Sequence, residues 1–468
     1  MALNLGFSIS IEYSIINENL ASDCRNPCGY SIFKSMSEPD QTPLSAGPNP
    51  PEAWKKNTTI FLSSQALSLL GSALVQYALL WHITLQTKSG LMMTLYIICG
   101  FLPTFFLSPF AGVWADRYDR KKLIILADAI IAAVTLLMAI VFLSGNRSFP
   151  LMLIVAAVRA FGSAIQQPAV GAILPQMVPQ EYLTKVHGIN GSIQSALSFA
   201  APLLSGVLYS FMKLEAIFFI DAVTAALAIF LLAGFLRVAP HARALQRKNL
   251  KSQASPYFKD MADGFRYIKE HRFLVGFFIY VGTFLILVTP AALLTPLQTA
   301  RRFGEEVWRL TAIEMLFSVG MMAGGLLIAA WGGFKNRMLT MVASNIIMAF
   351  CTIALGLTED FWLYLIVMGF FGISMPYYNT PSMVMIQTHV EESYMGRVFS
   401  VMTMISSSLM PLGMLIFGPL ADKISIEILL LGTGAAMLLT AATVLGRKKL
   451  ISAGLPKVAE GANPAPLA

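Results

Sequence analysis

Four charged side chains stand within long apolar stretches of the chain, where a charge requires a partner or a purpose: Asp128, Arg159, Asp221 and Glu314. A charge at the centre of a bilayer costs about 2.5–3.5 kcal/mol or more. Asp128 and Arg159 occupy consecutive apolar stretches that would run antiparallel, so we expect them to come within pairing distance. Such a pair has two interpretations: a fixed ion pair that sets helix packing, or a proton-linked switch in which protonation of Asp128 frees Arg159.

A second group of residues suited to a mechanical role lies between Gly112 and Lys122, where four basic and two acidic side chains separate two apolar runs. The segment must be a short loop at one membrane face, and its basic residues indicate that this face is cytoplasmic. A topological role explains the basic residues but not Gly112 or Asp116. Gly112 permits a close helix approach. Asp116 falls at the C-terminal end of a helix, where the macrodipole disfavours an anion, so it needs a partner.

Two sets of polar residues are candidates for lining a cavity that holds a ligand. The first is a stripe at spacings of three, four and four in the first apolar stretch: Gln65, Ser68, Ser72 and Gln76. It either lines a cavity or seals against another helix through hydrogen bonds. The second set lies between two prolines that would bend their helix: Tyr377, Tyr378 and Asn379. Aromatic rings beside an amide suit a bulky, mostly apolar ligand, although a kinked helix packed on its neighbours explains them equally well.

These residues are positioned by a chain of membrane-spanning helices. The 468 residues are 56% hydrophobic and 12% charged, with a mean hydropathy of +0.67, whereas soluble proteins carry about twice that charged fraction. The alternation of residues needed for a membrane barrel is missing. Most basic residues fall in loops on one predicted side, so the net charge of +8 reflects membrane orientation, and we expect no nucleic-acid partner. The four cysteines support neither a disulfide framework nor a metal site.

Apolar stretches long enough to span a bilayer recur along the chain. Twelve are expected, at about 58–82, 91–113, 122–143, 150–172, 186–211, 215–236, 274–297, 309–330, 338–357, 361–387, 397–420 and 426–446. They predict a disordered tail over 1–56, a six-helix bundle over 57–236, a cytoplasmic linker over 237–273, a second bundle over 274–446 and a cytoplasmic tail over 447–468. Both termini are then cytoplasmic. Residues 1–35 make a poor signal peptide, and we hypothesise that translation begins at Met36, which the intact mass of the natural protein would decide.

The linker and the two halves have patterns of their own. The second half of the linker has apolar residues at helical spacing, Phe258, Met261, Phe265 and Ile268, which predict an amphipathic helix along the cytoplasmic face that ties the halves together. The halves repeat each other weakly at a constant offset: Tyr182, Lys185, Val186 and Gly206 match Tyr394, Arg397, Val398 and Gly418. Arg120 matches Arg337, but Gly333 stands where Asp116 would recur.

The segment from Gly112 to Lys122 resembles the G-x-x-x-D-R-x-x-R-K loop motif between helices 2 and 3 of the major facilitator superfamily of transporters. Over about residues 57–446 the chain resembles the macrolide-efflux and siderophore-exporter branch, which contains drug:proton antiporters. The segments that carry this resemblance are Phe101-Leu-Pro103, Ala127-Asp128, Val158-Arg159, Gln167-Pro168-Ala169, Phe219-Ile-Asp221-Ala and Tyr394-Met-Gly-Arg397-Val-Phe-Ser. The resemblance implies an all-α polytopic membrane protein with twelve transmembrane helices in two pseudo-symmetric six-helix bundles.

The resemblance also implies roles for the embedded charges. Proton-driven members place an arginine where Arg159 stands, although here Gly162 follows at the third position in place of the usual Gln-Gly at the third and fourth. Helices 3 and 6 are peripheral in this fold, which favours a structural role for Asp128 and Asp221. Helix 8 borders the cavity and keeps Glu314 a candidate for proton coupling. Helix 1 borders it too, which favours lining for the polar stripe.

Two further motifs implied by the resemblance act in conformational change. A cytoplasmic latch would comprise Gly112, Asp116, Arg117, Asp119, Arg120 and Lys121, with Asp116 contacting the start of helix 11 near Gly396 and Arg397 in an outward-open state. Gly188, Pro202 and Gly206 resemble the glycine-proline motif of helix 5 in drug antiporters, in an eroded form. Their small size still allows sliding contact with helix 8, but the erosion weakens the assignment of direction.

The sequence therefore predicts a secondary active transporter of the inner or plasma membrane that exports a bulky amphipathic compound, such as a macrolide-like drug or a siderophore, in exchange for protons. A lysophospholipid or nutrient transporter of the same fold is the alternative, followed by a non-transporting scaffold or sensor. We expect no enzymatic activity, no cofactor and no metal. We expect a monomer whose partners are its substrate, protons and the lipid bilayer. No nucleotide-binding loop appears, which argues against ATP as the direct driver.

Overall fold

The computed structural model describes residues 53–236, 238 and 255–455. Every regular element in this part of the chain is an α-helix, and twelve of its segments are long and apolar enough to cross a membrane. The predicted all-α class with twelve spans is confirmed. The expectations for residues 1–52, including a start at Met36, and those for residues 239–254 and 456–468 lie outside the described residues.

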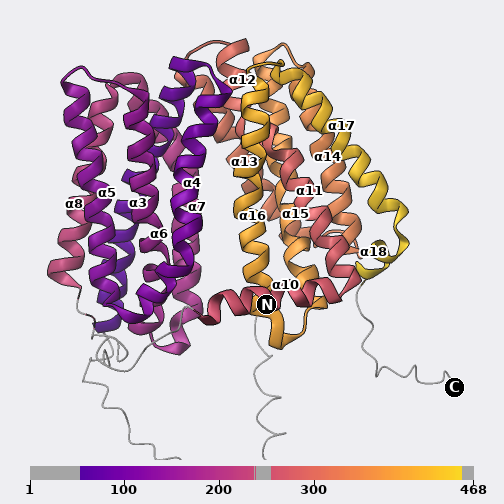
Figure 1. Cartoon of the computed structure of the whole chain (residues 1–468), viewed down its shortest axis with the longest axis horizontal. Coiled ribbons are helices and arrows are strands. Elements are labelled where there is room, and N and C mark those ends of the chain that lie inside the picture. The colour runs from indigo at the N-terminus through magenta and orange to yellow at the C-terminus, as the bar shows by residue number, and fades with distance from the viewer. Residues whose placement is uncertain (1–52, 237, 239–254, 456–468) are drawn as a thin grey trace, which may run out of the picture. The chain divides into compact units, whose positions relative to one another are not determined.

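The first six membrane-spanning helices form one group, the first helix group, coloured indigo to magenta in Figure 1. They are α3 (Ala53–Thr87), α4 (Gly90–Arg117), α5 (Arg120–Leu143), α6 (Phe149–Met177), α7 (Gln180–Phe211) and α8 (Leu214–Phe235). Within it, α5 packs on both α6 and α8, and α4 packs on α6. Phe142 of α5 meets Phe218 of α8 edge to face at 5.4 Å between ring centroids, so α5 is held against α8 by its buried apolar face.

The remaining spans form the second helix group (Figure 1, orange to yellow). They are α11 (Arg272–Leu293), α12 (Thr295–Arg302), α13 (Val307–Trp331), α14 (Arg337–Leu357), α15 (Phe361–His389), α16 (Glu392–Ala421) and α17 (Ile426–Gly446). The segment Arg272–Arg302 is one apolar span, interrupted between α11 and α12. α14 packs on α15 and α17, and α13 packs on α15. The short α18 (Lys448–Ala453) follows the last span.

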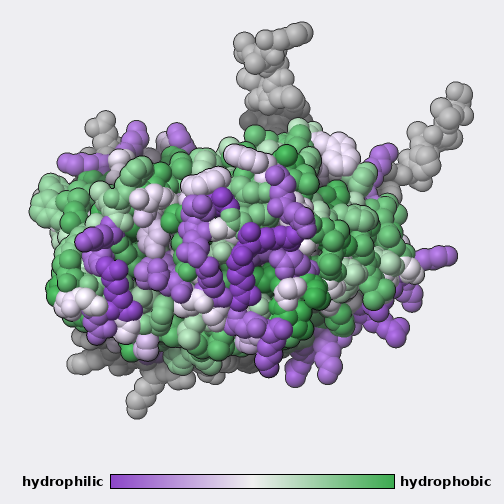
Figure 2. Space-filling model, turned by 90° about the horizontal axis from the view of Figure 1, so that it is seen from above, coloured by the Kyte–Doolittle hydropathy of each residue, from purple (hydrophilic) through white to green (hydrophobic). Residues whose placement is uncertain are grey.

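Successive spans reverse direction because the connections between them are short, so the loops gather at two ends (Figure 1). We call the end that carries α12 and the turns after α3 and α16 the α12 face. The opposite end carries α10 (Ser255–Glu270) and the α4–α5 turn, and we call it the α10 face. Figure 2 looks onto the α12 face, where hydrophilic residues gather across the middle and hydrophobic residues lie around the rim. This distribution suits helices whose outer sides contact lipid.

Capping side chains fix where α5 and α14 begin on the α10 face. Asp119 Oδ1 accepts hydrogen bonds from the backbone N–H groups of Lys121 and Lys122, at 3.0 and 3.3 Å. Asn336 Oδ1 does the same at the start of α14, at 3.0 and 3.2 Å. Both caps directly precede the arginines that the internal repeat aligns, Arg120 and Arg337. The repeat therefore extends to the capping position, where an aspartate and an asparagine do the same work.

The linker helix α10 packs against α16 of the second helix group. A Cβ added at Gly264 would lie 2.9 Å from the carbonyl oxygen of Arg397. Tyr267 stacks on Tyr394 with 4.4 Å between ring centroids. A helix is present where the linker was expected to have one, with Ile268 buried and Phe265 43% exposed; its position along a cytoplasmic membrane face stays a prediction.

Candidate functional site

Arg159 and Asp221 form a buried ion pair in the first helix group. Arg159 Nη1 lies 2.5 Å from Asp221 Oδ2, and their side chains are 10% and 0% exposed. Nη1 also donates to Thr135 Oγ1, and Nη2 donates to the Ser72 carbonyl oxygen at 3.1 Å. A Cβ added at Gly71 would lie 2.9 Å from Asp221 Oδ1, so this glycine lets α3 approach the pair closely. The pair thus joins α3, α5, α6 and α8.

Asp128 does not pair with Arg159, so the predicted contact between them is wrong. Its Oδ1 accepts hydrogen bonds from Ser68 Oγ and Gln166 Nε2, each at 2.7 Å. The reason is depth. Arg159 stands level with Thr135, which is seven residues beyond Asp128 along α5, or roughly 10 Å at 1.5 Å per residue. Asp128 is 1% exposed, and its Oδ2 has no hydrogen-bond partner among the described residues.

The polar stripe of α3 seals against other helices more than it lines a cavity. Gln65 and Ser68 are 3% and 4% exposed, and Ser68 donates to Asp128. Ser72 Oγ donates to Asp221 Oδ1 at 3.5 Å. Lining is therefore wrong for Gln65 and Ser68, because their side chains point into the first helix group; Gln76 is exposed.

The three residues expected to hold a ligand on α15 do not face one cavity. Tyr378 is 2% exposed and stacks on Phe284 of α11 at 3.8 Å between ring centroids, inside the second helix group. Tyr377 lies near Trp331 at 6.1 Å, and Asn379 is exposed. For Tyr378 the packed, kinked helix is the interpretation that fits, because successive residues of a helix point in different directions.

Glu314 is the embedded acid without a fixed partner. Its side chain is half-buried on α13, and no hydrogen bond or ion pair of its carboxylate is found within the described part of the chain. It lies within electrostatic reach of Tyr77 on α3, which belongs to the other helix group. The position between the groups keeps it a candidate for binding a proton or a cation.

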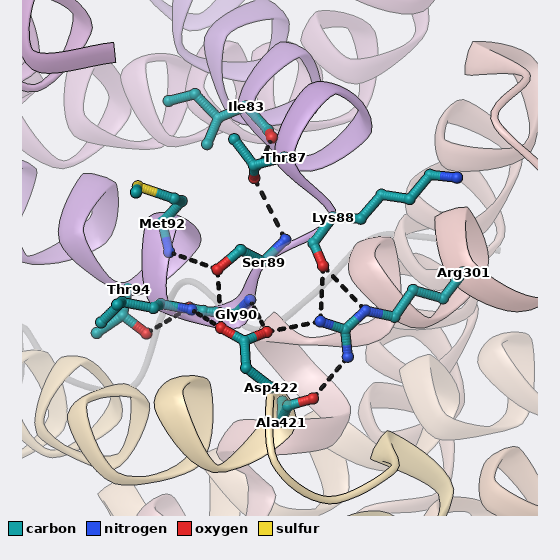
Figure 3. Close-up of polar contacts among 11 residues, drawn as sticks. Ile83, Thr87, Lys88, Ser89, Gly90, Met92, Thr94, Arg301, Ala421 and Asp422 are labelled. Atoms are coloured by element: carbon teal, nitrogen blue, oxygen red, sulfur yellow. Dashed lines mark hydrogen bonds and ion pairs between the residues drawn. The ribbon is translucent and has the colours of Figure 1, made fainter.

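A polar network joins the two helix groups on the α12 face (Figure 3). Asp422, just after α16, accepts hydrogen bonds from the N-terminus of α4: Ser89 Oγ at 2.7 Å, Gly90 N at 2.7 Å and Leu91 N at 2.9 Å. Arg301 of α12 lies 2.6 Å from Asp422 Oδ1 and donates to the Lys88 carbonyl oxygen. A carboxylate at a helix N-terminus is favoured by the macrodipole. Sequence reasoning missed this site, although an acid after one span and the Ser-Gly pair before another were visible.

Two glycine–threonine contacts bring the helix groups together beneath that network. A Cβ at Gly206 of α7 would lie 1.8 Å from Thr311 Oγ1 of α13, and one at Gly418 of α16 would lie 1.7 Å from Thr94 Oγ1 of α4. Gly206 and Gly418 are partners in the internal repeat, and each threonine is the fifth residue of its helix. The close approach of α7 to α13 that was expected at Gly206 is therefore present, with a symmetric counterpart between α16 and α4.

The helix groups separate toward the α10 face. A Cβ at Gly188 of α7 would meet nothing within 4 Å. A pocket of about 640 Å³ lies between α7 and α13, lined by Gly188, Gly191, Ser192, Ser195, Ala196, Phe199 and Met322. A larger pocket of about 810 Å³ lies between α4 and α16. The groups are thus in contact at one end and apart at the other.

The loop expected to act as a latch is tied within the first helix group. Lys121 Nζ donates to the carbonyl oxygens of Ala233 and Leu236 at the end of α8, at 3.2 and 2.8 Å, where a cation suits the dipole. Arg120 donates to Ala115 and Ala172 carbonyl oxygens at 3.0 and 2.8 Å. The side chain of Asp116 lies outside the described atoms. The Arg397 guanidinium lies 5.4 Å from the Tyr394 ring. A contact between Asp116 and the start of α16 in an outward-open state stays a prediction.

The Asp422 network is expected to survive mild acid. Burial raises the pKa of Asp422, but hydrogen bonds from the Leu91 and Gly90 backbones, Ser89 and Arg301 outweigh it and lower the pKa below its usual value. A lowered pKa means that the stabilisation is present above the usual pKa and is lost only as pH falls through the lowered one. We expect the ratio of Ser195→Cys labelling rates in Asp422→Asn and in the unchanged chain to differ from one and to stay constant between about pH 8 and pH 5, because the pH dependence of the thiol itself is the same in both. A pH-dependent contribution that disappears in Asp422→Asn would contradict this.

Comparisons with known proteins agree with one another. A family model described as Major Facilitator Superfamily matches residues 59–414. The macrolide efflux protein A of Streptococcus pyogenes is 30% identical over 376 residues, which cover 80% of this chain and 91% of that protein. The staphyloferrin A transporter of Staphylococcus aureus is 24% identical over 388 residues, covering 79% and 90%. A solved bacterial homologue of the human lysosomal transporter Spinster, described as inward-facing and unoccupied, aligns with a TM-score of 0.59 at 15% identity, over 86% of this chain and 96% of that one.

Proposed function

The chain belongs to the major facilitator superfamily, and on that basis we propose that it exports a bulky amphipathic compound by alternating access in exchange for protons. The compound would be a macrolide-like drug or a siderophore, the cargoes named for two of its relatives. The two helix groups would be the moving parts, and a transporter of this kind exposes a site between them to one side at a time.

The observation that carries the proposal is the contrast between the two ends of the interface. The α12 face is joined by the Asp422 network and by the contacts of Gly206 and Gly418. Toward the α10 face the groups enclose pockets of about 640 and 810 Å³. This contrast supports the proposal, because one end state of an alternating-access cycle would have its site open toward one face, here the α10 face.

The charges favour a cytoplasmic α10 face. That face carries the basic α4–α5 loop and the lysines that follow Arg447. The α12 face carries fewer basic side chains, and five of them form ion pairs with acids: Lys88–Glu305, Arg147–Glu215, Arg301–Asp422, Arg302–Glu427 and Arg309–Glu306. The excess of basic residues sets orientation, so the described state would open inward, and both termini would be cytoplasmic.

Proton coupling has three separate candidate positions in this arrangement. Arg159 and Asp221 are mutually neutralised and deep in the first helix group. Asp128 keeps one oxygen without a partner among the described residues. Glu314 lies between the groups, where opening and closing would change its contact with water. An acid whose surroundings differ between the two end states can bind a proton in one and release it in the other.

Drug accumulation in efflux-deficient cells that express the full chain tests the proposal. The panel would comprise macrolides, other amphipathic drugs and siderophores, with and without a protonophore. We expect the chain to lower accumulation of at least one compound, and the protonophore to abolish that effect, because export would draw on the proton gradient. Cells expressing Gly418→Val at matched membrane levels serve as the control for binding without transport, because this change is expected to prevent closure of the α12 face without unfolding the protein.

Two results would count against the proposal. Lower accumulation that persists with the protonophore would exclude the proton gradient as the energy source of export. No change across the panel, with the protein present in the membrane, would favour the lysophospholipid or nutrient transporter that shares this fold.

A further inference from the structure

The larger pocket between the helix groups is lined by aromatic and hydroxyl side chains. We call it the aromatic groove. It is lined by α4, α10 and α16: Phe101, Thr104, Phe105, Phe106, Ser108, Phe110, Met261, Phe399, Ser400, Thr403, Met404 and Ser407. Its volume of about 810 Å³ is in the range of sites that hold drug-sized ligands. Phe106 is 63% exposed.

The polar groups of the groove act mainly as hydrogen-bond acceptors. Ser400, Thr403 and Ser407 each donate their hydroxyl proton to a carbonyl oxygen of their own helix, at 2.9, 3.0 and 2.8 Å. Thr104 donates to the Ala160 carbonyl oxygen at 3.3 Å. A hydroxyl that has used its proton still offers two lone pairs. Ser108 is the exception, because no such bond of its hydroxyl is found in the described part of the chain.

The groove also lacks charge. Among the described residues that line it there is no Lys, Arg, His, Asp or Glu. A carboxylate placed there would lose its water and meet acceptor oxygens and aromatic rings, which is unfavourable. A ligand hydroxyl or protonated amine would instead find acceptors, and its apolar frame would cover the exposed rings.

We propose that the aromatic groove binds the exported compound, and that its acceptor-rich, uncharged lining selects amphiphiles with hydroxyl or amine donors over carboxylate-rich ones. The proposal rests on the proposed function and narrows it to one substrate class. A carboxylate-rich siderophore is then disfavoured as a cargo of this chain. Thr403 and Ser407 are the specificity-determining residues, because they are one turn apart on α16 and both line the groove.

Direct binding to the purified full-length protein tests the groove. The probe is radiolabelled erythromycin, a hydroxylated macrolide with an amine, competed by unlabelled erythromycin or by a carboxylate-rich siderophore. Thr403→Val keeps the shape of the side chain and removes its acceptor, so we expect about threefold to tenfold weaker binding. Thr403→Ser should restore most of the affinity. Thr388→Val is the matched control, because Thr388 makes the same kind of backbone bond on α15 outside the groove.

The outcomes separate the groove from the proposed function. One outcome is protonophore-sensitive efflux of erythromycin with binding unaffected by Thr403→Val and by Thr403→Val combined with Ser407→Ala. It would overturn the proposal that the aromatic groove binds the compound, and it would support proton-coupled export. Weaker binding in those variants, without any efflux by the unchanged chain, would support binding in the aromatic groove and overturn the proposal that the chain exports the compound. Preferential binding of the siderophore, or no binding of erythromycin, would overturn the selectivity proposed here.

Discussion

Gly418→Val is expected to abolish export by preventing closure of the α12 face. The first atom of any added side chain would lie 1.7 Å from Thr94 Oγ1 and 2.8 Å from the Gly90 carbonyl oxygen. Turning Thr94 aside would relieve only the first clash, because the second is with backbone. The same hydroxyl is held by hydrogen bonds to the Gly90 and Met414 carbonyl oxygens, at 2.7 and 3.1 Å. The variant should therefore fold but lose the state described here.

Cysteine labelling measures this effect directly. A Ser195→Cys reporter lines the pocket that opens toward the α10 face, and a membrane-impermeant maleimide applied from that side should label it in the unchanged chain but much more slowly with Gly418→Val. Native cysteines are replaced first. Gly432→Val is the control, because a Cβ at Gly432 meets nothing within 4 Å. Equal labelling and export in Gly418→Val and Gly432→Val would contradict the prediction that the Gly418–Thr94 contact is needed to close the α12 face.

Asp221→Asn is expected to destabilise the protein strongly. It removes the counterion of Arg159, whose guanidinium is nearly buried at membrane depth, and Asp128 is too far along α5 to replace it. Breaking a buried pair by removing one partner costs about 3–5 kcal/mol. Thermal stability of the detergent-solubilised protein, followed by size-exclusion chromatography, should fall sharply.

The double variant Arg159→Met with Asp221→Leu distinguishes structure from coupling. Replacing both members of a buried pair by apolar residues is often neutral or stabilising, so thermal stability should return while export does not. Glu359→Gln serves as a control for loss of an acid, because the Glu359 side chain is 89% exposed in a loop. If the stable double variant still exports in a protonophore-sensitive way, the pair is structural only, and Asp128 and Glu314 remain the coupling candidates.

The spans and the paired glycines were predictable because they depend on local properties. Apolar length identifies a span, and the constant offset between Gly206 and Gly418 marks equivalent points of two similar halves. The partner of Arg159 was not predictable, because a sequence gives the order of helices but not their relative depth and rotation. Asp128 and Asp221 are both aspartates within apolar stretches, and only the three-dimensional arrangement shows that Arg159 lies level with Asp221 and Thr135.

The Asp422 network was missed for a related reason. Arg301 and Asp422 each stand beside an apolar stretch, and no pattern around either residue indicates a partner. Their meeting with the start of α4 depends on how two helix groups are placed side by side. The contact between α10 and α16 was not predictable either, because periodicity counts apolar side chains, whereas the close approach is at Gly264, which has none.

The two glycine–threonine contacts bear on how readily the cycle turns over. Thr94 and Thr311 each donate their hydroxyl proton to a carbonyl oxygen one turn back in their own helix, at 2.7 and 3.1 Å. When α4 leaves α16, or α13 leaves α7, these threonines keep that bond, and no stranded hydroxyl penalises separation. Apart from the 3.1 Å bond of the Thr94 hydroxyl to the Met414 carbonyl oxygen, these two contacts are held by close van der Waals packing, which weakens steeply with distance. Separating the helices at these two contacts therefore costs little free energy, as a transporter that opens and closes repeatedly requires.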